Sequence, residues 1–307
     1  MFRKLTIALL VLVVFLSACG PIATAAPASM SLTDGLGRIV TLPAAAQKIV
    51  SLAPSNTEIL FAIGAGAQTI GRDEFSDYPA EAQSLPSVGG SMGNYSTEQI
   101  AALKPDLVLA AEINTPEQVK AISDLGLTVY YLSNPKTLED LYVNIEIVAK
   151  LTGHETAAAA LVDSLKARVA AVDEKIAPLS SRPTVFYEID ASDPAKPYSA
   201  GPGTFVDLLI ERAGGANLVG LIGITDPYPQ VSLEQVVSAD PGIILLGDAA
   251  YGTTPESVAQ RPGWEKLAAV QNQQVFAFDD NLVSRPGPRL VDGLEALARL
   301  LHPGAFE

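Results

Sequence analysis

Few residues of this chain could carry catalysis or hold a metal ion. It has one cysteine, Cys19, and two histidines, His154 and His302, which are expected at a helix start and near the tail, both at the surface. No Ser-His-Asp arrangement is convincing, and no histidine, cysteine and carboxylate cluster has metal-ligand spacing. Gly64-Ala65-Gly66 lacks the third glycine of a dinucleotide-binding loop and is better explained as a helix end. The sequence therefore predicts no enzyme, no cofactor and no resident metal.

Side chains that could bind a ligand fall in loops at the expected carboxyl ends of strands, where open α/β sheets bind ligands. The loops are 54–57, 74–78, 89–95, 190–203, 226–229 and 279–288, and they hold Phe75, Tyr78, Met92, Tyr95, Tyr198, Tyr228 and Arg285. Aromatic lining with a few polar groups predicts a cleft for a large, partly apolar ligand. The alternative is that each aromatic side chain only fills the core of its own loop.

The elements that would position these loops alternate between strand and helix. The pattern includes a buried strand at 48–53, a turn at 54–56 and a helix at 57–63. Such alternation predicts a mostly parallel sheet covered by helices. Two helical stretches then follow at 138–151 and 154–179, the second on the order of 35–40 Å long. A new strand begins at 184, so we expect an N-terminal lobe at 32–135, a connecting helical segment at 136–182 and a C-terminal lobe at 183–307.

One stretch occurs twice, at 96–109 and 232–245, with an offset of 136 positions and no gap. Each copy predicts a serine N-cap with a capping box, a short helix, a proline and a buried strand. Each helix carries a carboxylate in its first turn, Glu98 in one copy and Glu234 in the other. The favourable interaction of an acid with the helix dipole could explain both. Alternatively, the pair forms a two-point docking surface for basic residues of a partner.

Composition and charge exclude one class of function. The chain has 307 residues, enough for two domains, and 48% of them are hydrophobic. Its formal net charge is −14, from 34 acidic and 20 basic residues. Nucleic-acid binding needs a basic patch, so we expect no nucleic-acid partner.

The N-terminus has the pattern of an export signal. Arg3 and Lys4 precede an apolar run at 5–15, and Leu16-Ser17-Ala18-Cys19-Gly20 resembles a bacterial lipobox, in which the cysteine is lipidated. We therefore expect a signal peptide at 1–18 and a lipid-anchored tether at 19–31. The alternative is a plain secretory signal. Either predicts an exported protein, and the lipobox predicts one held at the membrane, on its periplasmic or outer face.

Taken together, the segments 49–58, 76–79, 103–108, 228–232 and 285–289 resemble the solute-binding lipoproteins of ABC importers for cobalamin, ferric siderophores and haem. The resemblance spans roughly residues 36–301 and is greatest to cobalamin-binding members. It implies two Rossmann-like lobes joined by a single long α-helix, at about 154–179, with a ligand cleft between the lobes and little closure on binding. It implies a permease dimer with its ATPase as partner, and Glu98 and Glu234 match the two family glutamates that meet arginines on that dimer.

The resemblance also implies ligand contacts from Phe75, the 90–94 loop, Tyr228 and the 280–285 loop. With the loops above, the candidate ligand-binding residues are Ser55, Asn56, Phe75, Met92, Asn94, Tyr95, Tyr198, Tyr228, Asp280 and Arg285.

The chain departs from cobalamin binders at two positions. It has Ser91-Met92 where they carry a tryptophan after Val88, and Tyr228 stands in place of another tryptophan. A ferric siderophore or haem therefore remains an alternative ligand, and for haem Tyr95, Tyr198, Tyr228 or Met92 could ligate the iron. Two further alternatives are an exported α/β enzyme and a lipoprotein sensor.

Overall fold

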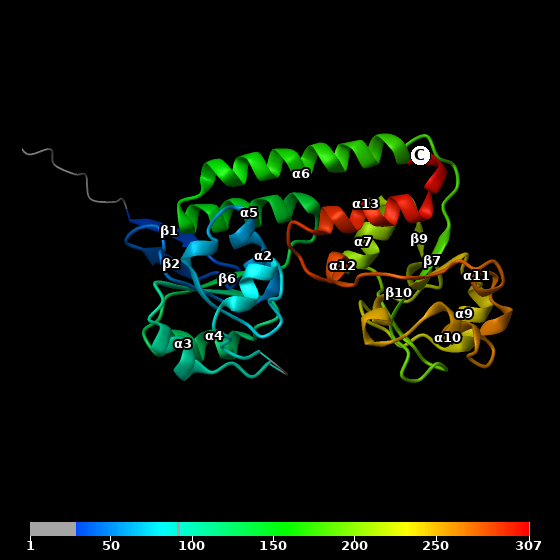
Figure 1. The fold of residues 1–307 in the computed structure, drawn as a ribbon, viewed down its shortest axis with the longest axis horizontal. Helices are drawn as coiled ribbons and strands as arrows, with labels where there is room; N and C mark the ends of the chain where they lie inside the picture. The colour runs from blue at the N-terminus through cyan, green and yellow to red at the C-terminus, as the bar shows by residue number, and fades with distance from the viewer. Residues whose placement is uncertain (1–28, 91–92, 307) are drawn as a thin grey trace, which may run out of the picture.

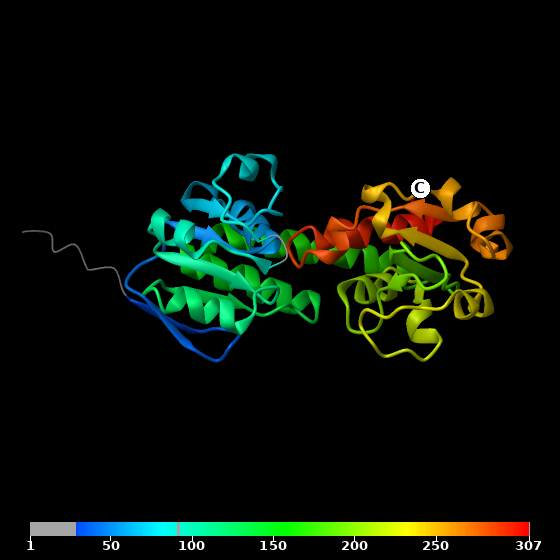
Figure 2. The same ribbon diagram turned by 90° about the horizontal axis from the view of Figure 1, so that it is seen from below.

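The computed structural model describes residues 29–90 and 93–306. The predicted signal peptide 1–18, Cys19, most of the tether 19–31 and Met92 lie outside the described residues. The chain forms two halves that lie side by side, each built on its own β-sheet (Figures 1 and 2). None of the described helices is both long enough and apolar enough to cross a membrane.

The first half contains a parallel sheet in the order β4-β3-β5-β6 and a separate hairpin of β1 and β2. Its strands are β1 (Met30–Thr33), β2 (Ile39–Leu42), β3 (Ile49–Ser51), β4 (Thr69–Arg72), β5 (Leu107–Ala111) and β6 (Val129–Leu132). All residues of β3, β5 and β6 are buried, as expected for parallel strands covered on both faces.

Helices cover both faces of this sheet. They are α2 (Pro54–Ala62), α3 (Thr97–Leu103), α4 (Pro116–Ser123) and α5 (Leu138–Thr152), with short 3₁₀ turns η1 (Gly66–Gln68) and η2 (Ala80–Ser84), and α6 (Glu155–Ile176) packs on α5. Leu107 and Leu109 of β5 share a core with α2 and α5, whereas Val108 and Ala110 share another with α3 and α4. Successive strand side chains point to opposite faces, so one strand supports both cores.

The second half repeats this plan with a mixed sheet in the order β11-β10-β7-β8, in which β9 also pairs with β7. Its strands are β7 (Thr184–Asp190), β8 (Tyr198–Ser199), β9 (Ala216–Asn217), β10 (Ile243–Leu246) and β11 (Val275–Ala277). Only β8 runs antiparallel to its neighbour.

The helices of the second half again lie on both faces of its sheet. They are α7 (Phe205–Arg212), α8 (Leu218–Leu221), α9 (Leu233–Ala239), α10 (Pro255–Ala259), α11 (Ala268–Gln271), α12 (Asn281–Ser284) and α13 (Leu290–Leu301), with 3₁₀ turns η4 (Gly247–Tyr251), η5 (Trp264–Lys266) and η6 (Pro303–Ala305). α7 and α13 share a core with Tyr187 and Leu245, while Phe186 and Ile244 pack with α8, α9 and Trp264.

One hydrophobic core extends from the first half into the second. It joins the α5 face of the first sheet to the α7 face of the second through apolar residues of α6 and α13. α6 packs against both α5 and α13 and runs along both halves (Figure 1). The predicted two-lobed α/β fold is confirmed.

The repeated segment folds as the same unit in both halves. Ser96 caps α3 and Ser232 caps α9, and both helices end in a left-handed residue, at Lys104 and Asp240, before β5 and β10. The expected capping box is complete only at Ser232, because at Ser96 only the serine hydroxyl takes part.

Three predicted boundaries were wrong. α2 begins at Pro54 rather than at 57, because proline is tolerated at the first helical position, where its missing N–H costs nothing. The segment 279–288 is not all loop, since it contains α12, and 190–203 contains β8. β8 has only two residues and α12 only four, too few to show a period in the sequence.

Candidate functional site: a cavity between the two halves

A cavity of about 560 Å³ lies between the two halves, with walls from both. It is lined by Ala53, Pro54, Ser55, Phe75, Ala111, Glu112, Ile113 and Asn134 from the first half, and by Tyr228, Asn281, Ser284, Arg285 and Pro286 from the second.

The first wall is built where the strand order of its sheet reverses. The chain passes from β3 to β4 on one side and then returns to β5 on the other side of β3. Such a reversal leaves a crevice at the carboxyl ends of the strands. Residues 53–55 follow β3, and residues 111–113 comprise the last residue of β5 and the two that follow it. Both segments line the cavity.

The second wall consists of Tyr228, residues of α12 and the two residues that follow this helix, Arg285 and Pro286. Tyr228 is 59% exposed, and its backbone N–H donates a hydrogen bond to Asp226 Oδ1 at 2.9 Å. At the start of α12, Asn281 donates from both its backbone and its side chain to Asp279 Oδ1. The two hydrogen bonds from Asn281 fix the start of α12, and Arg285 directly follows the end of this helix.

Four predicted ligand-binding residues, Ser55, Phe75, Tyr228 and Arg285, line this cavity. Phe75 is 50% exposed, so both walls present an accessible aromatic ring.

The other described candidates lie in the surrounding structure. The buried amide of Asn56 donates to the carbonyl of Leu109 at 3.1 Å. The hydroxyl of Tyr95 donates to Leu52 O at 3.0 Å, Asn94 is exposed, and Tyr198 pairs with Asp190 through β8. Asp280 accepts a hydrogen bond from the hydroxyl of Tyr187 at 2.7 Å.

Sequence reasoning missed one part of the first wall, formed by Glu112, Ile113 and Asn134. The Asn134 amide donates to Glu112 Oε2 at 2.9 Å, which ties the ends of β5 and β6 together. These residues lack the aromatic signal that marked the other loops. Their position directly after two buried strands was the signal that could have identified them.

Below the cavity, a buried chain of hydroxyl groups supports Phe75. Thr57 Oγ1 lies 2.8 Å from Ser51 Oγ and 2.7 Å from Ser76 Oγ, and Ser76 in turn donates to Asp73. Asp73 Oδ1 also accepts from the Phe75 amide at 2.9 Å. Burial raises the pKa of Asp73, although these hydrogen bonds act in the opposite direction.

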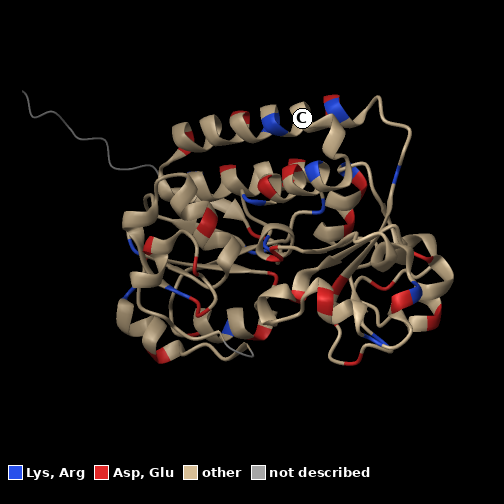
Figure 3. Ribbon diagram, turned by 45° about the vertical axis from the view of Figure 1, so that its right-hand side comes forward, with Lys and Arg blue, Asp and Glu red and all other residues tan. Residues whose placement is uncertain are grey.

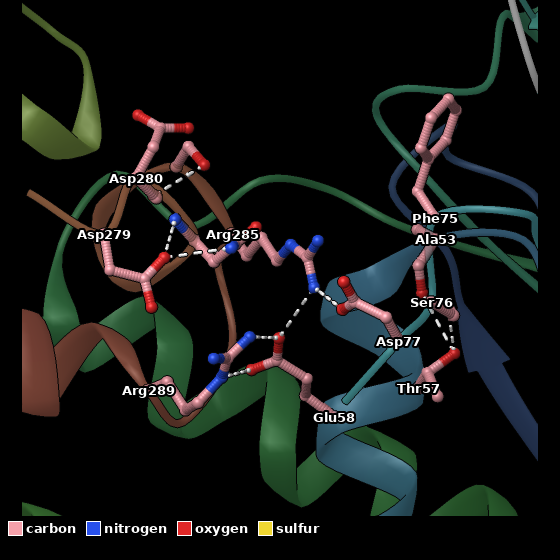
Figure 4. A network of polar contacts seen from close by, with 12 residues as sticks. Ala53, Thr57, Glu58, Phe75, Ser76, Asp77, Asp279, Asp280, Arg285 and Arg289 are labelled. Carbon is pink, nitrogen blue, oxygen red and sulfur yellow. Dashed lines mark hydrogen bonds and ion pairs between the residues drawn. The ribbon is translucent and has the colours of Figure 1, made fainter. Parts of the chain in front are cut away.

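An ion-pair network joins the two halves beside the cavity (Figure 4). Glu58 of α2 accepts two hydrogen bonds from Arg289, which precedes α13, at 3.0 and 2.6 Å. Arg285 donates to Asp77 at 2.5 Å. Burial raises the pKa of Glu58 despite its arginine partners. Burial also acts to raise the pKa of Asp77, but the hydrogen bond and charge of Arg285, together with a backbone hydrogen bond and the charge of Arg289, hold that pKa below its usual value.

The other predicted functional residues lie away from the cavity. Glu98 and Glu234 are exposed in the first turns of α3 and α9. His154 and His302 are half-buried rather than fully at the surface. A nitrogen of the His154 ring lies 3.0 Å from the carbonyl oxygen of Thr152, and one of the His302 ring lies 3.2 Å from that of Gly214. Within residues 29–90 and 93–306, no group of three or more potential ligands could hold a metal ion.

A cavity shared by two α/β lobes is the arrangement of a solute-binding protein. The model of the periplasmic binding protein family matches residues 49–282, and the chain belongs to this family.

Relatives with known names cover nearly the whole chain. YvrC of Bacillus subtilis strain 168, an uncharacterized ABC transporter substrate-binding lipoprotein, is 31% identical over 285 residues, covering 91% of this chain and 87% of that protein. The vitamin B12-binding protein of Vibrio cholerae serotype O1 is 31% identical over 270 residues, covering 86% and 92%. The solved structure of the apo haem-binding protein RhuT from Roseiflexus sp. RS-1 matches with a TM-score of 0.76 and 29% identity, covering 84% and 99%.

Proposed function

We propose that this chain is the solute-binding component of an ABC importer and that it binds a corrinoid such as cobalamin. The observation that carries the proposal is the cavity of about 560 Å³ between the halves, to which Phe75 and Tyr228 contribute one aromatic ring from each wall. A pocket of this size with an aromatic ring on each wall and polar side chains beside them suits a large, partly apolar ligand. The names of the substrate-binding and vitamin B12-binding relatives support the same role.

A ferric siderophore or haem is the second candidate ligand, and the likeness to the haem-binding protein supports haem. Haem binding through tyrosine would need an ionised phenol. Burial and the charge of Asp280 raise the pKa of Tyr228, and burial and the charge of Asp73 raise that of Tyr95. Both shifts make these phenols harder to ionise in the free protein.

Delivery of the ligand to the permease involves residues outside the cavity. Glu98 and Glu234, at equivalent positions of the repeated unit, contact arginines of the permease dimer, which works with its ATPase. Cys19 carries the lipid that holds the exported protein at the membrane. The segment 136–182 links an N-terminal lobe at 32–135 to a C-terminal lobe at 183–307, and α6 limits how far the lobes move because a continuous helix is stiff.

The test uses the soluble chain from Gly20 onward. It is mixed with cyanocobalamin and separated by gel filtration, and the visible absorbance of the protein peak is recorded. Stoichiometric co-elution is the expected result. A colourless protein peak would refute the corrinoid assignment, and ferric siderophores and then haem would be tested in the same way.

A further inference from the structure

Four charged residues from the two halves meet next to the cavity, as Figure 4 shows. Besides the two-bond contact between Glu58 and Arg289, Arg285 Nη1 lies 3.7 Å from Glu58 Oε1 and 2.5 Å from Asp77 Oδ1. Each acidic residue belongs to the first half and each arginine to the second. The contacts therefore act between the halves and not within one of them.

Three of the four side chains in this network are largely closed to solvent, whereas that of Asp77 is 55% exposed. The side chain of Glu58 is 1% exposed, and those of Arg289 and Arg285 are 13% and 14% exposed. The ring of Tyr78 covers the guanidinium of Arg289, with its centroid 4.0 Å from Cζ. Removing one partner of the buried Glu58–Arg289 pair leaves a buried charge without compensation.

Of the four residues in this network, only Arg285 lines the cavity. Its guanidinium is held by Asp77 on one side and by Glu58 on another. Glu58 is in turn fixed by its two hydrogen bonds to Arg289. A change at Glu58 would therefore reach a bound ligand through Arg285.

The backbone between the two arginines also approaches α2 closely. A Cβ atom added at Gly287 would lie 3.1 Å from Glu58 Oε2 and 3.5 Å from the carbonyl oxygen of Ser55. The loop thus rests directly on the helix whose first turn lines the cavity. The distance between the halves at this point is set by contact as well as by charge.

We propose that Glu58 is a positioning residue that latches the two halves together and holds Arg285 at the cavity wall. The latch, defined as Glu58, Asp77, Arg285 and Arg289, joins the halves beside the cavity, in addition to the continuous chain and the hydrophobic core that the halves share. Its effect on ligand affinity rests on the proposed function, whereas its effect on the separation of the halves does not.

The first experiment needs no ligand. Full-length chain carrying Cys19→Ser is purified in detergent, spin-labelled at Glu117→Cys of α4 and Glu256→Cys of α10, and studied by double electron–electron resonance. Both positions are exposed and they lie in different halves. With Glu58→Gln, we expect a longer and broader distance distribution. An unchanged distribution in a variant with native circular dichroism would overturn the latch.

The control is a buried ion pair within one half. Arg261 donates to both oxygens of Glu188 at 2.6 and 2.8 Å, and Glu188 is fully buried. Glu188→Gln should leave the distance distribution unchanged. If Glu58→Gln does not fold, Arg289→Lys replaces it, because lysine keeps the charge but cannot form the two-bond contact. A native distribution in folded Arg289→Lys would equally overturn the proposal.

A second experiment tests the positioning role with cyanocobalamin as the probe. Glu58→Gln should weaken binding about tenfold when Arg285 is present. In the Arg285→Gln background, the same change should weaken it by less than about twofold. Equal losses in both backgrounds would overturn the positioning role. If the wild-type chain does not bind cyanocobalamin, the corrinoid assignment fails, and the distance measurements still decide whether the latch exists.

Discussion

Tyr187 donates its phenolic hydrogen to Asp280 Oδ1 at 2.7 Å, which joins β7 to the residue just before α12. Tyr187 is fully buried, so this bond fixes the position of the chain segment that carries Arg285.

Tyr187→Phe should therefore destabilise the protein. The carboxylate of Asp280 loses a buried donor, which costs about 1–3 kcal/mol in the free energy of unfolding. Urea denaturation followed by circular dichroism measures the effect. In a double-mutant cycle with Asp280→Asn, a zero coupling energy would contradict the assigned hydrogen bond.

Phe75→Ala should weaken binding of cyanocobalamin by about tenfold, because a ring that lines the cavity is lost. Tyr251→Ala is the control, since Tyr251 is 91% exposed and lies in η4, apart from the cavity-lining residues described above. Isothermal titration calorimetry measures both affinities. Equal affinities for wild type and Phe75→Ala would count against this cavity as the binding site.

If Glu98 and Glu234 dock on the permease as proposed, replacing both with lysine should abolish transport and leave ligand affinity intact, because like charges would then face the arginines proposed on the permease. Glu117 and Glu256 provide a matched control, since each is also an exposed acid in the first turn of a capped helix. The double change of these two to lysine should leave uptake of radiolabelled cobalamin unchanged. A loss of ligand affinity in the first variant would refute the docking role.

The pH dependence of stability should reveal the buried carboxyl of Asp73. Burial raises its pKa above the ordinary value of 3.8, against the lowering effects of the bonds from Ser76 and Phe75 and of the charges of Arg72 and Arg285. The folded state then binds more protons than the unfolded state, so the contribution of Asp73 is fully present below pH 3.8 and is lost as the pH rises through the folded pKa.

The comparison is between wild type and Asp73→Asn, which cannot titrate at this position. The stability of the wild type relative to the variant should fall as the pH rises from 3.8 toward 7. Urea denaturation at several pH values measures the difference. If the stability of the wild type relative to Asp73→Asn instead rose with pH, the hydrogen bonds would outweigh burial in setting the pKa of Asp73.

The fold could be predicted largely from the sequence, because buried apolar strands and capped helices have strong local signals. The duplicated unit at Ser96 and Ser232 is one such case, since capping depends on residues only three positions apart. The start of α2 was missed because Pro54 indicates either a turn or a first helical residue, and only packing decides between them.

The site was less predictable. Phe75 and Tyr228 could be identified as aromatic residues in loops, whereas Glu112 and Asn134 depend on how the ends of β5 and β6 meet. Charge patterning could not reveal that Glu58 and Arg289 are partners. Acidic residues occur throughout both halves (Figure 3), so many pairings were equally compatible with the sequence.

The partners in the Glu58–Arg289 contact are 231 positions apart in the chain. During synthesis from the N-terminus, the first sheet is complete at Leu132, long before Arg289 emerges from the ribosome. The first half can therefore fold early, while the contact that joins it to the second half has to form among the last. Until that contact forms, the first turn of α2 lacks the wall that faces it across the cavity, so the cavity is among the last features of the described structure to be assembled.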